Sequence, residues 1–203
     1  LQAHIQHQIP GFEICSKQNS PLMRALGRLL FFNRHFMDRY VTTSYPRIYV
    51  PEGSWPRRSI ESRVAVLAHE FVHLRDRQRL GWAFNLLYLA PQILALGAIG
   101  ALWDSQWILA LIFLLPWPSP GRTWIELRGY VMSMAIHWHL HGERADLSWT
   151  EHQFTGPSYY WMWPFRGSVQ RWLSRAAVAT SSSWVMPSGT GMSTYPTAPS
   201  SQS

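Results

Sequence analysis

The chain contains very little cysteine and lysine. Cys15 is its one cysteine, which excludes a disulfide within the chain and is typical of a reducing compartment. Lys17 is its one lysine, so the net charge of +7 comes from arginine. No nucleic-acid-binding motif accompanies this charge. We therefore assign the arginines to membrane flanks and solvated surface rather than to a specific nucleic-acid partner.

Charge is also absent from a long internal segment. Residues 81–102 form a run of 22 positions without a charged side chain, and about 20 apolar residues span a bilayer as a helix. Pro91 is expected to kink this helix. Beyond Asp104, residues 107–117 are again apolar. The region at about 81–117 is therefore predicted to be a hydrophobic helical hairpin.

This hairpin can be one full membrane span with a short return, a re-entrant hairpin, or two buried helices of a soluble domain. Tryptophans gather at its ends, as expected of interfacial anchors, at positions 82, 103, 107, 117 and 124. Arginines flank it at positions 75, 77, 79, 122 and 128. The positive-inside rule predicts a membrane-associated protein with both flanks on the cytoplasmic side. A soluble cytoplasmic protein is the alternative.

The most informative motif is His69-Glu70-Phe71-Val72-His73, which reads H-E-x-x-H inside a helical pattern. Histidines four residues apart on a helix point the same way and can bind one Zn²⁺ ion. The glutamate between them can then act on a zinc-activated water. Two core histidines without a metal are the alternative.

The surrounding residues predict the helix that carries this motif. Ser59 suits the N-cap position, and Glu61 suits the first turn. His69, His73 and Asp76 fall on the face opposite an apolar stripe. The stripe consists of Ile60, Val64, Leu67, Phe71 and Leu74.

Asp76 follows His73 by almost one helical turn. It can orient a zinc ligand, but we favour a surface charge paired with Arg79 or Arg75.

A catalytic zinc site needs a third protein ligand, and we favour Glu126. Glu126 opens a second helical pattern that runs to about Leu140 and can lie across the first helix. A capping box, Thr123-x-x-Glu126, would explain this glutamate without a metal. The competing ligands are Glu143, Asp146 and the histidines His137, His139 and His141.

Residues 41–51 are rich in β-branched and aromatic side chains, and their prolines, Pro46 and Pro51, suit an edge strand. An edge strand beside a zinc site can receive a peptide as an added strand. An ordinary edge strand is the alternative.

On these motifs the chain resembles the gluzincin metallopeptidases, and most closely the membrane-embedded branch with the CAAX prenyl proteases and the bacterial heat-shock membrane protease. In that branch H-E-x-x-H is followed by a hydrophobic hairpin and then by an E-x-x-A-D-like string with the third ligand. The string here is Glu126-Leu127-Arg128-Gly129-Tyr130, with Tyr130 in place of the aspartate. The resemblance covers about residues 40–146 and extends to small phage and bacterial zincins.

The expected fold is mainly α with a small edge β-sheet, and the resemblance implies a zincin-like minimal metallopeptidase core carrying the hairpin. We expect one domain over residues 1–179, with an amphipathic helix over residues 20–40. Residues 180–203 are rich in Ser, Thr and Pro and are predicted to be a disordered tail.

The expected function is zinc-dependent hydrolysis of a peptide or protein substrate, with Glu70 as general base. The residues that can stabilise the transition state are Tyr130, His137, His152 and Tyr159. One alternative is a non-catalytic, zinc-stabilised membrane or phage structural protein. The other is a basic, aromatic-rich binding protein in which H-E-x-x-H is accidental.

Overall fold

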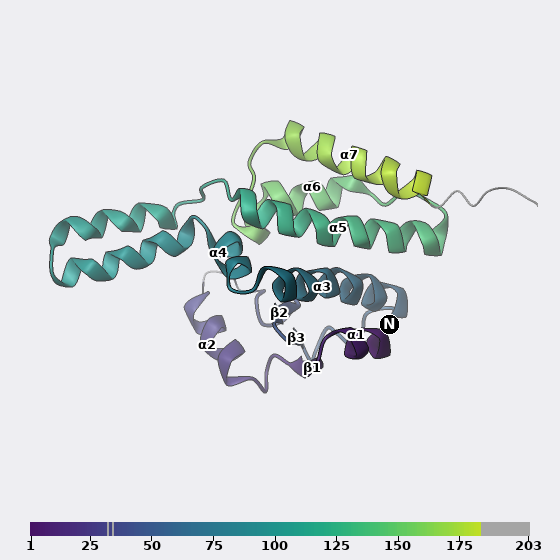
Figure 1. Cartoon of the computed structure of the whole chain (residues 1–203), viewed down its shortest axis with the longest axis horizontal. Coiled ribbons are helices and arrows are strands. Elements are labelled where there is room, and N and C mark those ends of the chain that lie inside the picture. The colour runs from purple at the N-terminus through teal and green to yellow at the C-terminus, as the bar shows by residue number, and fades with distance from the viewer. Residues whose placement is uncertain (32, 34, 184–203) are drawn as a thin grey trace, which may run out of the picture.

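A computed structural model of the chain describes residues 1–183 except 32 and 34. The fold is mainly helical with one small sheet, as predicted (Figure 1). The α-helices are α1 (Gln2–Gln8), α2 (Pro21–Leu29), α3 (Ile60–Leu80), α4 (Ala83–Leu89), α5 (Pro120–His141), α6 (Leu147–Thr155) and α7 (Arg166–Ser183). The strands are β1 (Glu13–Ser16), β2 (Thr42–Ser44) and β3 (Arg47–Val50), and the 3₁₀ helices are η1 (Gln92–Leu102), η2 (Ser105–Leu114) and η3 (Pro157–Tyr159).

The sheet has the order β1-β3-β2, with β1 parallel and β2 antiparallel to the central strand β3. The single edge strand predicted over residues 41–51 is therefore wrong in part. The chain turns at Tyr45 and Pro46, so that this segment forms a hairpin of two strands. Within this segment β2 lies at an edge of the sheet and β3 is central, because β1, which the sequence did not indicate, pairs with the other side of β3.

Helix α3 lies between the sheet and a layer formed by α5, α6 and α7 (Figure 1). On the sheet side, Leu67 and Leu74 of α3 pack into a core with Ile48 of β3. A second core lies under α5, α6 and α7 and includes Met134 and Phe154. The contact between α3 and α5 therefore lies between two apolar cores, each of which holds one of the two helices in place.

The beginning of α3 agrees with the prediction. The Ser59 side chain accepts a hydrogen bond from the Ser62 backbone amide at 3.1 Å, so Ser59 is the N-cap. The predicted apolar stripe is buried at Leu67 and Leu74, whereas Ile60 is 71% exposed at the first position of the helix.

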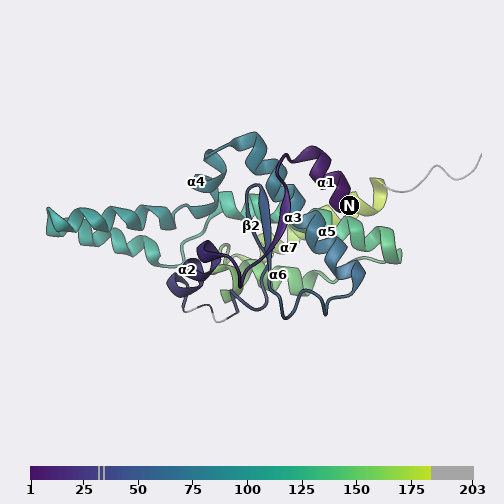
Figure 2. The ribbon, with the colours of Figure 1, turned by 90° about the horizontal axis from the view of Figure 1, so that it is seen from below.

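A long hairpin, formed by η1 and η2, projects away from the rest of the molecule (Figures 1 and 2). Its legs pack closely, since a Cβ on Gly100 would lie 2.7 Å from Trp107 Cγ. Asp104 lies at the turn and accepts a hydrogen bond from the Gln106 amide at 3.0 Å. A helical hairpin is thus present, but its legs occupy residues 92–114 rather than the predicted 81–117.

Residues 81–102 do not form one continuous helix, and the break lies at Pro91, where a kink was expected. The chain bends by 89° between α4 and η1, and Pro91 lies at the break. Among the described residues, no single helix is both long and apolar enough to cross a membrane, and the bent pair of α4 and η1 passes that test only when taken together.

Two further predictions need correction. The helix predicted over residues 20–40 ends at Leu29, because the following chain folds back over α2. A Cβ on Gly27 would lie 2.9 Å from Met37 Cγ, which shows how closely the returning chain packs. Helix α7 runs to Ser183, past the predicted start of the tail at residue 180. The rest of that predicted tail, 184–203, lies outside the described residues.

Candidate metal centre

Three predicted ligands meet at the contact between α3 and α5. His69 and His73 come from successive turns of α3, and Glu126 comes from the second turn of α5. Glu126 Oε2 lies 3.3 Å from His69 Nε2 and 3.8 Å from His73 Nε2. All three side chains are buried, and one donor atom from each lies within 4.8 Å of the other two. This cluster can hold a metal ion.

The donor set and its spacing fit a small divalent cation. Tetrahedral zinc with bonds of 2.0–2.1 Å separates neighbouring ligand atoms by about 3.3 Å, close to the separations observed. Among the described residues, Glu126 Oε2 is a buried oxygen that receives no hydrogen bond. A buried carboxylate oxygen without a donor is costly unless a cation satisfies it.

Gly129 provides the space in which His69 sits. A Cβ at this position would lie 2.6 Å from both Cε1 and Nε2 of the His69 ring. Gly129 follows Glu126 by three residues, so both face α3 from the same side of α5. A side chain at position 129 would therefore push the imidazole away from Glu126.

The electrostatics of the cluster keep Glu126 ionised. Burial alone would raise the pKa of Glu126, but the two imidazoles that face it outweigh burial and hold that pKa well below its ordinary value. Burial likewise would lower the pKa of His73, but the Glu126 carboxylate outweighs it and the pKa of His73 is raised. The site therefore presents an anionic ligand and two imidazoles at neutral pH.

Glu70, the predicted general base, is hydrogen-bonded to β2, an edge strand of the sheet. It is buried, and its Oε2 accepts a hydrogen bond of 2.6 Å from the Thr43 hydroxyl on β2. Glu70 is close enough to His73 for its charge to contribute to the raised pKa of that histidine. The sheet edge, the glutamate and the metal-ligand cluster are thus adjacent.

Tyr130 also borders the cluster. Its ring meets the His69 ring edge-on, with centroids 4.8 Å apart, and its hydroxyl lies 3.5 Å from that of Tyr159. Burial raises the pKa of Tyr130, and the nearby Glu126 charge raises it further, so Tyr130 remains a neutral phenol. Two other candidates lie elsewhere: the His137 ring contacts the His141 ring at a tilt, with centroids 4.6 Å apart, and His152 is exposed.

Asp76 contradicts our prediction of a surface charge. It is 2% exposed, and its two carboxylate oxygens accept hydrogen bonds from Arg128 Nε and Nη2, each at 2.9 Å. The pairing with Arg79 or Arg75 is therefore wrong, because α5 supplies Arg128 across the helix contact. His73 Nδ1 has no hydrogen-bond partner among the described residues, so Asp76 does not orient that ligand either.

The competing third ligands lie away from the cluster. Glu143 is exposed, and Asp146 caps α6 by accepting a hydrogen bond from the Ser148 amide at 2.8 Å. His139 is exposed as well. The capping-box alternative for Glu126 is also wrong, because α5 begins at Pro120 and Thr123 instead donates to the Met162 carbonyl at 3.4 Å.

Two residues at the cluster had no assigned role in the sequence. Thr43 contacts Glu70, and the Tyr88 hydroxyl donates to Glu126 Oε1 at 2.7 Å. Both contacts join segments far apart in the chain, so no local spacing marked them. In the sequence, Tyr88 is distinguished only as one of the few residues with a polar group in the uncharged run over residues 81–102.

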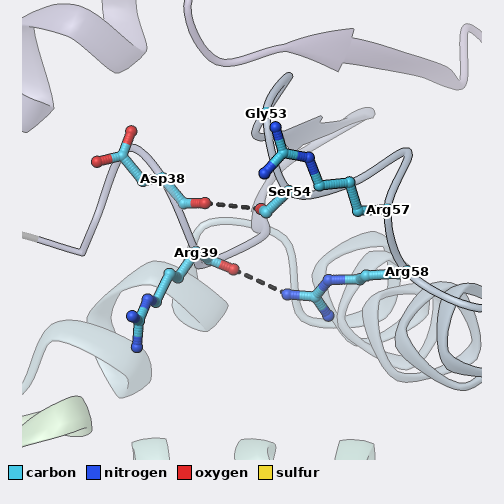
Figure 3. Close-up of a pocket in the computed structure, with 6 residues that line it drawn as sticks. All are labelled: Asp38, Arg39, Gly53, Ser54, Arg57 and Arg58. Carbon is cyan, nitrogen blue, oxygen red and sulfur yellow. Dashed lines mark hydrogen bonds between the residues drawn. The ribbon is translucent and has the colours of Figure 1, made fainter.

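A separate pocket lies beside the start of α3 (Figure 3). Its walls are joined by two hydrogen bonds, from Ser54 Oγ to the Asp38 carbonyl at 2.6 Å and from Arg58 to the Arg39 carbonyl at 2.9 Å. None of its lining residues belongs to the metal-ligand cluster. We therefore do not include it in the candidate site.

Comparison of the chain with protein-family models, curated proteins and solved structures finds no match. The fold and the site define a mainly helical protein with a buried cluster of two histidines and one glutamate that can hold a metal ion.

Proposed function

We propose that this protein is a zinc metallopeptidase. The observation that carries the proposal is the convergence of both H-E-x-x-H histidines with Glu126, while Glu70 contacts the edge strand of the sheet. Two imidazoles and one carboxylate are a ligand set typical of catalytic zinc, which keeps a fourth position open. The same donors fit a structural site less well, because structural zinc is usually bound by four protein ligands.

In this mechanism, His69, His73 and Glu126 would hold the zinc ion. Bound zinc would supply Lewis-acid chemistry, acidifying water and polarising the scissile carbonyl. Glu70 accepts a proton from the attacking water and delivers it to the leaving amine. Thr43 occupies Oε2 of Glu70, so Oε1 is the oxygen that we assign to proton transfer.

The surroundings of Glu70 support a peptide substrate. Among the described residues, strand β2 pairs with β3 alone, so an extended peptide can add to its other side through main-chain hydrogen bonds. Such a peptide would pass next to Thr43 and Glu70. Tyr130, as a neutral phenol beside His69, is the residue we assign to stabilising the developing oxyanion.

We further propose that the hairpin associates with a lipid bilayer. Large apolar side chains are exposed along both of its legs, including Leu96, Ile99, Ile108 and Leu109. An apolar surface of this extent is unusual in a water-exposed position. Arg122 lies at the base of the hairpin, where it can face lipid headgroups. The peptidase site would then act close to a membrane surface on the cytoplasmic side.

The proposed function is tested by separating metal binding from turnover. Wild-type protein purified without added metal should contain about one zinc ion per chain, and His69→Ala should lose it. Glu70→Gln should keep the zinc ion but cleave fluorescence-quenched peptides about 10²- to 10⁴-fold more slowly in the presence of phospholipid vesicles. Glu61→Gln, an exposed glutamate in the same helix, is the matched control and should cleave at the wild-type rate.

The possible outcomes separate the proposal from its alternatives. Zinc without any peptide cleavage would favour a zinc-stabilised structural protein. Absence of zinc from folded wild-type protein would reduce the motif to coincidence and leave a binding protein as the explanation.

A further inference from the structure

The base of the hairpin contacts a metal ligand directly. Tyr88 lies near the end of α4, just before the hairpin begins at Gln92. Its hydroxyl donates to Glu126 Oε1 at 2.7 Å, whereas Glu126 Oε2 faces the two histidines. The two oxygens of this carboxylate therefore have different partners.

The position of Tyr88 is determined by the contact between α4 and α5. Its carbonyl accepts a hydrogen bond of 2.8 Å from Arg122 Nε, and the Arg122 guanidinium lies 5.2 Å from its ring centroid. The ring stacks on Phe84, with centroids 5.9 Å apart. A Cβ on Gly121 would lie only 2.5 Å from the Leu87 carbonyl oxygen, so the two backbones approach closely. The hydroxyl consequently has little freedom to leave Glu126.

The chemical consequence concerns the rotation of the Glu126 carboxylate. The terminal torsion of a glutamate side chain is broad, and a free carboxylate can present either oxygen, or both, to a cation. A hydrogen bond to Oε1 selects one orientation and leaves Oε2 as the ligand atom. Partners of this kind typically change metal affinity by about 10- to 100-fold.

We propose that Tyr88 is a positioning residue that holds Glu126 as a one-oxygen metal ligand and joins the hairpin to the metal centre. The proposal rests on the metal site of the proposed function, but not on its peptidase step. The Tyr88 hydroxyl thus makes metal affinity depend on how α4, at the base of the hairpin, packs against α5.

The experiment measures metal affinity rather than turnover. Zn²⁺ affinity of the full chain in detergent micelles is determined by competition with a chromophoric chelator, for wild type and Tyr88→Phe. The variant should bind about 10- to 100-fold more weakly. The visible spectrum of Co²⁺-loaded protein should also change, since it reports the coordination number. The unfolding temperature of each metal-free protein shows whether it is folded.

Tyr160→Phe is the matched control. The Tyr160 hydroxyl donates to the Leu114 carbonyl on the other leg of the hairpin, away from Glu126. Its removal should leave Zn²⁺ affinity within twofold of wild type. Tyr88→His, which supplies an N–H donor in place of the O–H, is the second variant and should bind more tightly than Tyr88→Phe.

Each outcome decides the proposal. Equal affinity in Tyr88→Phe and wild type, or the same loss in Tyr160→Phe, would overturn it. If Tyr88→Phe does not fold, an affinity of Tyr88→His more than 100-fold below wild type would overturn it too. Wild type that binds no metal would remove this proposal and the proposed function together. Zinc binding that weakens in Tyr88→Phe, without peptide cleavage by wild type, would support Tyr88 and refute the peptidase.

Discussion

The Thr43 hydroxyl donates a hydrogen bond of 2.6 Å to Glu70 Oε2, which joins the edge strand of the sheet to the glutamate of the H-E-x-x-H motif. One oxygen of the carboxylate is thereby held in place, and the orientation of the other follows from it. A peptide that adds to β2 would lie beside the group proposed to move the proton.

Thr43→Val should lower kcat for peptide cleavage by about 10-fold, because the Glu70 carboxylate loses the donor that orients it. Zinc content should stay unchanged, since Thr43 contacts no ligand of the cluster in the hydrogen bonds described. Thr43→Ser keeps the hydroxyl and should recover most of the rate. Equal rates for Thr43→Val and wild type would show that this contact has no role in turnover.

Gly129→Ala should weaken zinc binding by at least 10-fold, because the new Cβ would lie 2.6 Å from two atoms of the His69 ring. Gly167→Ala is the control, since its Cβ would meet only the end of a flexible arginine at 3.7 Å. Both changes improve helix propensity by about 1 kcal/mol. Chelator competition measures the affinities, and comparable affinity in the two variants would contradict the close approach at Gly129.

Arg128→Gln should lower the free energy of unfolding by about 2–3 kcal/mol, because it leaves the buried Asp76 carboxylate without its paired donors. Arg47→Gln removes an exposed pair with Glu13 and should cost much less, because solvent screens that pair. Urea unfolding of the metal-free proteins measures both values. Similar costs for the two variants would mean that burial of Asp76 adds nothing to the strength of its pair.

The stability of the metal-free protein should depend on pH through His73. A raised pKa means that the folded state binds a proton more tightly than the unfolded chain. The resulting stabilisation is complete below the ordinary value of 6.5 and is lost as pH rises through the raised pKa. The free energy of unfolding in the presence of a chelator should therefore fall as the pH rises above 6.5. Glu126→Gln removes the carboxylate that raises this pKa, and its stability should fall less over the same range.

Arginine at two exposed hairpin positions should abolish membrane association. The double variant Ile99→Arg with Ile108→Arg places a charge on each leg. The free-energy cost of inserting an arginine at the centre of a bilayer is about 2.5–3.5 kcal/mol. Co-flotation with phospholipid vesicles should fall to the background level. Ile60→Arg, on an even more exposed isoleucine of α3, should float like wild type. Flotation of the double variant at the wild-type level would refute the proposed role of the hairpin.

The sequence predicted what depends on local spacing. His69 and His73 share a face of α3 because they are four residues apart, and the first turn of that helix follows from Ser59. The partners that cross the fold were not predictable in this way. Thr43 and Glu70 are 27 positions apart, and Tyr88 and Glu126 are 38 apart, so only tertiary packing brings each pair together. The prediction for Asp76 was wrong for the same reason, since Arg128, the residue that pairs with it, comes from α5.

The bend of the chain at Pro91 was predictable from one residue, but the two-stranded fold of residues 41–51 was not. In that segment the β-branched residues favoured an extended backbone throughout, and the turn at Tyr45 and Pro46 divides it. Strand β1 contains Glu13 and Cys15, which do not favour a strand strongly. Its pairing with β3, which makes β3 the central strand, was therefore not predictable from the sequence.

The paired legs of η1 and η2 also shorten the search by which the chain folds. Asp76 and Arg128 are 52 positions apart, and closing a loop of that length costs configurational entropy before any contact repays it. Because the contacts within the hairpin are local in sequence, its legs can pair early in folding and bring the start of α5 close to the end of α3. The loop that remains to be closed is then shorter by residues 92–114, which lowers the entropic cost of docking α5 on α3 by about 0.5 kcal/mol.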